Sequence, residues 1–195
     1  MFYFFMTKEE IQTLAEKSKE NDLNAFTLLV KHFEVILLRY IFRLSDISQA
    51  EAEEILQETF LHAWRYLKEY NESFAFSTWI YRIAHQKTIS YHRKEISRGK
   101  EHKILWNEEL CSNIPSNLNI EKNIRISELQ TDVQNSIAHL PSPQKEVIIL
   151  KYLEGKSYDE ISDILQIPTG TAGSLASRGK KLLKKFLQKT YDESQ

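Results

Sequence analysis

The sequence predicts an all-α protein made of two small helical domains joined by a linker. Only five glycines and four prolines occur among 195 residues, so few positions interrupt a helix. Apolar residues recur every three or four positions over long stretches, and no stretch alternates apolar and polar residues as a half-buried strand would. The length suffices for two domains, and a hydrophobic content of 42% supplies their cores.

Composition limits the location of the protein and its chemistry. The single cysteine, Cys111, excludes an internal disulfide and a cysteine-cluster metal site, and it fits a reducing cytoplasm. The six histidines lack a paired ligand spacing, so we expect no metal and no other cofactor. The start, MFYFFMTKEE, is short, has no basic leader and runs into charges, so we expect no signal peptide and no membrane insertion.

The first domain is predicted over residues 8–97 as a bundle of about four helices. Helical periodicity begins over residues 8–21, and Asp22 is expected to cap a second helix. Ser48 and Glu51 have the capping-box spacing that starts a third helix.

The third helix has one apolar side and one charged side. Its inward residues are predicted to be Ala52, Ile55, Thr59, Ala63 and Leu67, with Leu56 and Phe60 broadening the stripe. Its opposite side is predicted to carry Glu54, Gln57, Glu58, Leu61 and Arg65. The residue pattern alone favours an ordinary solvated surface for this outer face, although a leucine lies among its charges.

The fourth helix is predicted over residues 76–94, FSTWIYRIAHQKTISYHRK. Its inward residues are predicted to be Trp79, Ile80, Ile83, Ala84 and Tyr91. Its other side is predicted to carry Arg82, His85, Gln86, Ile89, His92 and Arg93. Basic residues far outnumber acidic ones over residues 77–103, so this stripe favours nucleic acid, whose phosphates it would neutralise. Aromatic groups at its edge could stack on exposed bases.

Residues 98–124 lose helical periodicity and are predicted to be a linker. Four apolar residues within it indicate that it docks on the protein itself or on a partner: Ile104, Leu105, Trp106 and Leu110.

The second domain is predicted over residues 125–190. Ser142 and Pro143 open a helix that stops at Gly155, and Ser157 and Glu160 form a capping box for a short helix. The segment QIPTGT breaks the pattern, after which Thr169 or Thr171 is expected to cap a final helix. Two helices joined by a tight turn predict a helix-turn-helix.

The final helix is predicted to bury Ala172, Leu175, Ala176, Gly179, Leu182, Leu183 and Phe186. The outward residues are Gly173, Ser174, Ser177, Lys181 and Lys184. Residues 173–189 contain several basic residues and no acidic residue. Small polar groups near its start suit base edges, and the later lysines suit phosphates. A basic surface helix that binds no DNA is the weaker alternative.

Three motifs in this order resemble the extracytoplasmic-function group of bacterial sigma factors, the small two-domain initiation subunits of RNA polymerase. AEEILQETFLHAW, residues 52–64, is similar to the polymerase-binding helix of that family. Residues 76–94 are similar to its promoter-melting and minus-ten-reading segment, and residues 140–183 to its minus-thirty-five-binding helix-turn-helix.

The resemblance implies a sigma factor that is not an enzyme and that brings core polymerase to promoter DNA. The outer face of the third helix would dock on the clamp coiled coil of the largest polymerase subunit, and the beta subunit flap is a further expected contact. The implied core-binding residues are Glu54, Gln57, Glu58, Leu61 and Arg65. An anti-sigma factor that holds the protein inactive is the other expected partner.

The resemblance also implies two sets of DNA contacts. The loop over residues 71–76 would capture a flipped base of the minus-ten element, and the helix after it would handle the melted strand. The implied minus-ten residues are Asn71, Ser73, Phe74, Phe76, Arg82, His85, Gln86, Lys87 and Arg93. The implied minus-thirty-five residues are Thr169, Thr171, Gly173, Ser174, Ser177, Arg178 and Lys181.

The chain departs from the family pattern at several of these positions. Gln86 and Ser90 stand where the family usually has Asn and Asp, so the minus-ten contacts are expected to differ. Gly173 and Leu175 stand where basic residues are common, so we expect that minus-thirty-five affinity is weaker, that it shifts to Arg178 and Lys181, or that another partner contributes. The alternative function is a free-standing helix-turn-helix regulator, which would bind a palindromic duplex without polymerase.

Overall fold

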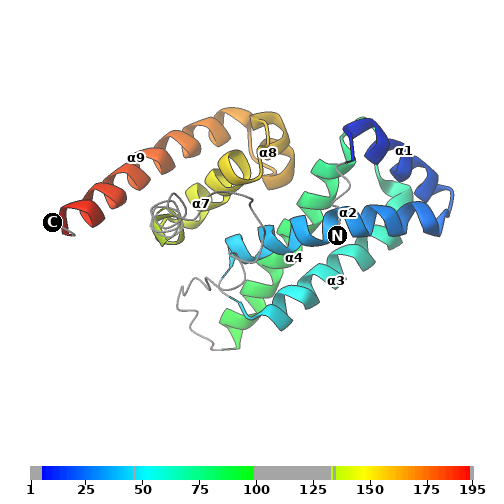
Figure 1. The fold of residues 1–195 in the computed structure, drawn as a ribbon, viewed down its shortest axis with the longest axis horizontal. Coiled ribbons are helices and arrows are strands. Elements are labelled where there is room, and N and C mark those ends of the chain that lie inside the picture. Colours follow the sequence, from blue (N-terminus) through cyan, green and yellow to red (C-terminus); the bar gives the residue numbers. More distant parts are fainter. Residues whose placement is uncertain (1–5, 46, 99–132, 134, 194–195) are drawn as a thin grey trace, which may run out of the picture. The chain divides into compact units, whose positions relative to one another are not determined.

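The computed structural model describes residues 6–45, 47–98, 133 and 135–193, and the regular elements with defined bounds in this part of the chain are all helical. The predicted linker over residues 98–124, with its four apolar residues and Cys111, lies outside the described residues except for Arg98. The chain divides into two compact units (Figure 1), and each is described by itself. The all-α prediction with two helical parts is confirmed.

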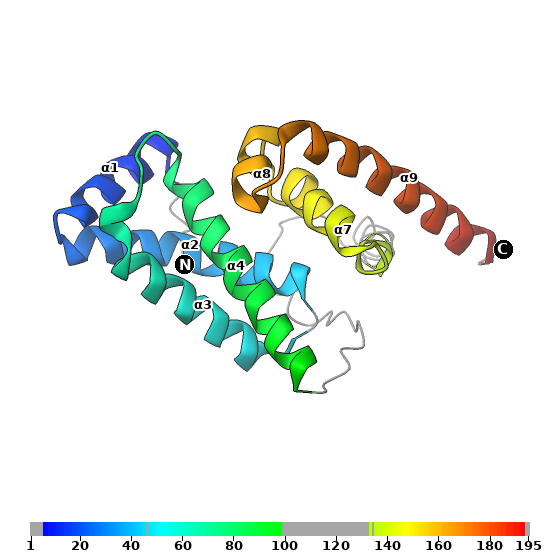
Figure 2. The same cartoon turned by 180° about the vertical axis from the view of Figure 1, so that it is seen from behind.

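Between residues 6 and 98, the described part of the first unit contains four α-helices and one 3₁₀ turn. They are α1 (Lys8–Lys19), α2 (Leu23–Leu44), α3 (Gln49–Arg65), η1 (Leu67–Glu69) and α4 (Phe76–Ser97). α2 contacts each of the other three α-helices, and α3 runs beside α4 (Figure 2). The core lies along α2, where Leu29, Leu37 and Ile41 are almost fully buried.

The predicted helix starts in this unit are confirmed. The Asp22 carboxylate accepts the amides of Asn24 and Ala25 at 2.9 and 3.1 Å. Ser48 and Glu51 form the reciprocal capping box, in which each side chain accepts the backbone amide of the other residue. α1 ends at Lys19, two residues before the predicted end, because Asn21 adopts a left-handed φ of 69° that turns the chain into α2.

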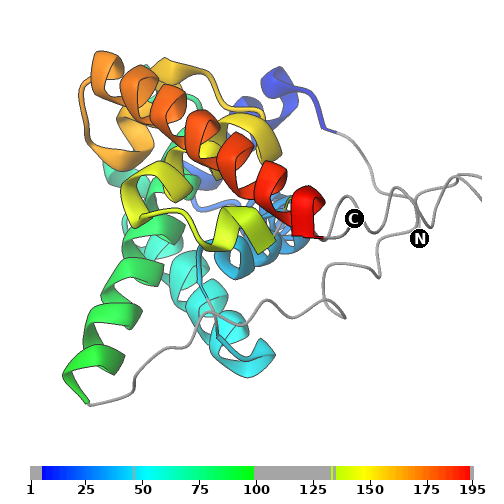
Figure 3. The ribbon, with the colours of Figure 1, turned by 90° about the vertical axis from the view of Figure 1, so that its left-hand side faces the viewer.

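The described C-terminal part of the chain contains α7 (Ser142–Ile148), the π-helical turn η2 (Ile149–Leu153), α8 (Tyr158–Leu165) and α9 (Thr169–Glu193), and the second unit holds all of them except residues 162–165 of α8. α9 packs along α7 (Figure 3). Gly155 ends the continuous segment formed by α7 and η2, as predicted. Its φ of +67° is one that glycine adopts without steric cost. The π-helical turn was not predicted, since its apolar pattern is also that of an α-helix.

The predicted threonine cap of the last helix is wrong. The carbonyl of Pro168 accepts the amides of Thr171 and Ala172, at 2.8 and 3.1 Å, and Thr169 is already the first helical residue. The Thr169 hydroxyl lies 3.4 Å from the Asp159 carboxylate and so contacts the preceding helix. The Ser157–Glu160 capping box that starts α8 is confirmed.

Candidate nucleic-acid interface

The outer face of α3 is a continuous exposed surface. The structure places all five predicted core-binding residues on it and leaves each of them exposed: Glu54, Gln57, Glu58, Leu61 and Arg65. Leu61 keeps 50% of its surface exposed among these polar groups. The face thus combines one exposed apolar group with charges of both signs.

Two contacts fix the α3 face relative to the basic stripe of α4. Lys87 Nζ lies 3.2 Å from Glu58 Oε2. The Tyr91 hydroxyl donates to Glu51 Oε1 at 2.5 Å, and the other oxygen of the same carboxylate takes part in the Ser48 capping box. Burial and the Glu51 carboxylate raise the pKa of Tyr91, so it stays a neutral donor. These two contacts join the α3 face to the basic stripe of α4.

His62 lies between these charges. Its ring centroid is 4.5 Å from that of Tyr66. Burial, and next the cations of Lys87 and Arg65, lower the pKa of His62 below its ordinary value of 6.5. A neutral imidazole is therefore favoured near neutral pH beside the α3 face.

The predicted DNA-facing residues of α4 remain accessible to different degrees. Gln86 and Arg93 are exposed, whereas Arg82, His85 and Lys87 are partly covered. More residues of α4 are buried than predicted, since Tyr81, Thr88 and Glu95 are buried in addition to Ile80 and Ala84. Trp79 and Tyr91, which were predicted to face inward, keep part of their surface exposed.

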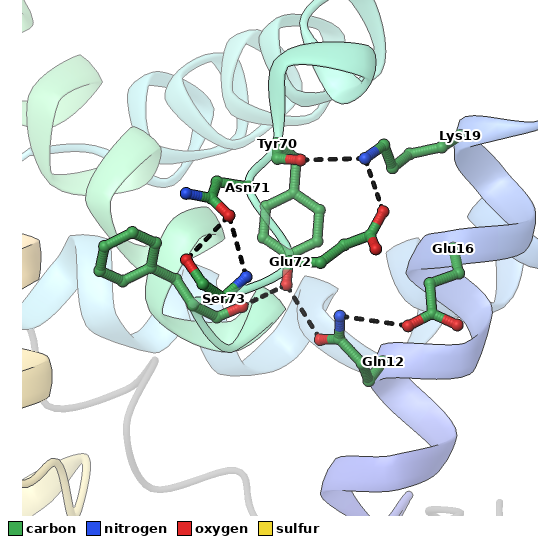
Figure 4. A network of polar contacts seen from close by, with 8 residues as sticks. Gln12, Glu16, Lys19, Tyr70, Asn71, Glu72 and Ser73 are labelled. Carbon is green, nitrogen blue, oxygen red and sulfur yellow. Dashed lines mark hydrogen bonds and ion pairs between the residues drawn. The ribbon is translucent and has the colours of Figure 1, made fainter.

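The loop before α4 is a hydrogen-bonded turn (Figure 4). The Phe74 amide donates to the Asn71 carbonyl at 3.1 Å. The Asn71 side-chain oxygen accepts the amide and the hydroxyl of Ser73 at 3.0 and 2.8 Å, the contact that makes Asn the preferred first residue of such turns. The turn leaves the Phe74 ring 46% exposed. Asn71 and Ser73 thus shape the loop by bonding to each other, and Phe74 is its most exposed apolar group.

Phe76 requires a correction. It was expected among the DNA-contacting residues, but it is only 2% exposed and cannot reach a base in this arrangement. Its ring centroid lies 5.5 Å from those of both Tyr70 and Trp79, and 5.8 Å from that of Phe33. Phe76 is the centre of an aromatic cluster that supports the loop from inside the unit.

Contacts between the loop and α1 were missed by sequence reasoning. Lys19 Nζ donates to the Tyr70 carbonyl at 3.1 Å and to the Glu72 carboxylate at 2.6 Å. The buried Tyr70 hydroxyl donates to the Phe74 carbonyl at 2.5 Å and lies 2.9 Å from Gln12 Oε1 (Figure 4). No periodicity or spacing indicates these partners, since they lie more than 50 positions apart along the chain.

The helix-turn-helix of the second unit presents a mostly polar and basic helix. Gln166, with a left-handed φ of 57°, turns the chain between α8 and α9. Five of the seven predicted contact residues are exposed: Thr169, Thr171, Ser177, Arg178 and Lys181. Gly173 and Ser174 are partly covered, and the Ser174 hydroxyl donates to the Thr171 carbonyl at 2.9 Å.

Two glycines of α9 have opposite surroundings. A Cβ on Gly179 would lie 2.7 Å from Ile148 Cγ1 of α7, so glycine permits the close packing of these helices. A Cβ on Gly173 would have no heavy-atom neighbour within 4 Å. Gly179 therefore has a packing role, and Gly173 lies on the open side of the helix.

Within the described part of the chain, no cluster of three His, Cys, Asp or Glu side chains could hold a metal ion. No helix within the same residues is long and apolar enough to cross a bilayer.

Both halves match the same family of transcription factors. The family model for Sigma-70 region 2 matches residues 29–97, and the model for Sigma-70, region 4 matches residues 130–183. The chain is 31% identical over 185 residues to the ECF RNA polymerase sigma-E factor of Haemophilus influenzae, which covers 91% of this chain and 95% of the relative. It is also 31% identical over 187 residues to the ECF RNA polymerase sigma factor SigW of Bacillus subtilis, covering 91% and 97%.

Solved structures share the fold. The structure of CnrH in complex with the cytosolic domain of CnrY superimposes with a TM-score of 0.66 at 18% identity, covering 92% of this chain and 97% of that one. The structure of the sigma factor RpoE in complex with the anti-sigma factor NepR from Bartonella quintana also superimposes with a TM-score of 0.66. Its sequence identity is 21%, and the match covers 85% of this chain and 98% of that one. The match of both regions in order, together with the identity to relatives over almost the whole length, shows that the chain belongs to the extracytoplasmic-function group of the sigma-70 family.

Proposed function

We propose that this sigma factor recruits core RNA polymerase through the outer face of α3 and contacts promoter DNA through the loop over residues 71–75, α4 and α9. The presence of regions 2 and 4 in one chain carries this proposal, since each region supplies one part of a bivalent promoter contact. The chain would act in the cytoplasm, where polymerase acts, and it would not be an enzyme.

The α3 face has the features of a protein-docking surface. Leu61 supplies exposed apolar area, and Glu54, Glu58 and Arg65 surround it with charges that would select a complementary partner. We expect the clamp coiled coil of the largest polymerase subunit to bind there, and the beta subunit flap to bind the second unit.

The loop and α4 would read and open the minus-ten element. Phe74 offers an exposed ring for stacking on an extruded base, and the exposed residues of α4 would hold the separated strand. The free energy of binding to the DNA would drive the opening of the minus-ten element. Exposed residues near the start of α9 would read the minus-thirty-five element, with Arg178 and Lys181 neutralising phosphates.

An anti-sigma factor is the proposed regulator. The Bartonella quintana relative in fold was solved with such a protein bound. For this chain we propose a partner that covers the polymerase-binding surfaces and keeps the factor inactive. Affinity purification from the native cell should recover polymerase subunits or this inhibitor.

Run-off transcription tests the proposal. Core polymerase with this chain should yield discrete transcripts from a genomic fragment library, whereas the chain alone should bind the same duplex fragments weakly. Tight binding to a palindromic duplex without polymerase, with no transcript, would instead identify the free-standing regulator.

A further inference from the structure

Helix α1 holds the loop before α4 from outside. Lys19 donates to the Tyr70 carbonyl at 3.1 Å and to the Glu72 carboxylate at 2.6 Å, so one ammonium group binds both the residue before the turn and a residue within it. Gln12, two helical turns earlier, lies 2.9 Å from the Tyr70 hydroxyl. Three points of the loop segment are therefore fixed by one face of α1 (Figure 4).

Each contact determines a different part of the loop conformation. The Tyr70 hydroxyl donates to the Phe74 carbonyl at the far end of the turn, and Gln12 Oε1 of α1 is a second acceptor within hydrogen-bond distance of the same hydroxyl. Lys19 fixes the near end, because its two acceptors belong to residues on either side of Asn71. With both ends fixed, the exposed Phe74 ring has a defined direction.

We propose that α1 is a positioning element for the base-reading loop, with Lys19 as its main positioning residue. This inference rests on the proposed function of the loop in capturing a minus-ten base. A loop that is ordered before it binds loses less conformational entropy when the base enters, so the captured base is bound more tightly. Lys19 and Gln12 precede residues 29–97, so this determinant lies outside the matched region 2 segment.

The same contacts are poorly suited to a purely stabilising role. The side chains of Lys19 and Glu72 are 25% and 47% exposed, and ion pairs at such sites add little to folding stability. α1 is held in the bundle by its own apolar face, where Ile11 and Ala15 are buried. Removal of the Lys19 ammonium should therefore release the loop and leave α1 in place.

The experiment uses holoenzyme assembled from core polymerase and the full chain. The probes are one promoter fragment that the wild-type holoenzyme transcribes and a series of its derivatives, each with one abasic site in the non-template strand of the minus-ten element. The measured quantity is the ratio of transcript from the intact promoter to transcript from each derivative. In a ratio, the fraction of active protein cancels.

The wild type should show a large ratio at the captured base. Lys19→Met, which keeps the side-chain stem and removes the donors, should lower that ratio about three- to tenfold and leave the other ratios unchanged. Lys19→Arg should restore most of it. Lys17→Met is the matched control, since Lys17 is an exposed lysine of the same helix, and it should behave as wild type.

Several results would overturn the inference alone. They are a wild-type ratio in Lys19→Met, an equal loss in Lys17→Met, or a uniform loss at all positions. A wild-type holoenzyme with transcripts but no position sensitive to an abasic site would overturn base capture, and the positioning role with it. A wild-type holoenzyme without promoter-specific transcripts would overturn the proposed function itself.

Discussion

Lys87 of α4 and Glu58 of α3 form an ion pair at 3.2 Å that joins the proposed polymerase-binding face to the proposed DNA-binding stripe. The Glu58 side chain is largely exposed, so the pair contributes about 0.2–1 kcal/mol to stability at most. Its importance lies in its position: substitution of either residue alters both surfaces at once. Tests of one surface are therefore cleaner at neighbouring residues.

Glu54→Lys should weaken binding to core polymerase about tenfold, because it reverses a charge in the middle of the α3 outer face. Competition with a labelled wild-type factor for core enzyme measures the affinity. Glu53→Lys is the matched control, an adjacent exposed glutamate of the same helix about 100° away around its axis. Equal losses in both variants would contradict a specific role of this face.

Lys87→Met should raise the pKa of His62 and still leave it below 6.5. Burial is the largest cause of the lowered value and remains in the variant, whereas the Lys87 cation, the next cause, is removed. Titration of the imidazole proton resonances by NMR measures the shift, and Lys68→Met serves as a control. A pKa that stays unchanged in Lys87→Met would show that the cation does not act on His62.

The same lowered pKa predicts how stability depends on pH. The unfolded chain binds the His62 proton more readily than the folded chain does. Stability therefore rises with pH between the lowered pKa of His62 in the folded chain and its ordinary value of 6.5. The His62 contribution is complete above pH 6.5 and is lost as the pH falls to the folded pKa. Urea unfolding of wild type and His62→Gln at several pH values should show the difference between them shrinking as the pH falls below 6.5. A constant difference would contradict this linkage.

Local chemistry explains why much of this fold is predictable. The Ser48–Glu51 and Ser157–Glu160 capping boxes depend on residues three positions apart, and both form as the sequence indicates. The apolar stripe of α3 is likewise set by helical periodicity, since Ala52, Ile55 and Ala63 are all buried.

Contacts between distant segments explain the errors. Phe76 begins a helix at the edge of a predicted DNA surface, and only the three-dimensional placement of Phe33 and Tyr70 shows that its ring is covered. The bond from Lys19 to Glu72 depends on how α1 packs, which neither residue's neighbours in the sequence determine. The roles of individual residues toward DNA and polymerase remain predictions.

Gly179→Ala and Gly173→Ala should change stability in opposite directions. The new methyl group at residue 179 would overlap Ile148 Cγ1, at 2.7 Å, and should cost about 1–3 kcal/mol. The same change at residue 173 meets open space and should stabilise α9 by about 0.5–1 kcal/mol. Urea unfolding compares the two variants. Stabilisation by Gly179→Ala would contradict the close packing of α7 and α9.

Ser177→Ala and Lys181→Ala should weaken promoter binding in two distinguishable ways. Both residues are exposed on the proposed DNA-facing side of α9. Loss of the Lys181 cation removes a phosphate contact, so affinity should fall on every minus-thirty-five sequence and the slope of log K against log salt should decrease by about 0.9. Loss of the Ser177 hydroxyl removes a base-edge contact, so affinity should fall about three- to tenfold on the preferred element only, with an unchanged slope. Holoenzyme binding to the preferred element and to its single-base variants, each at several salt concentrations, separates the two effects. If Ser177→Ala lowers affinity equally on all variants, the start of α9 contacts the backbone and reads no base there.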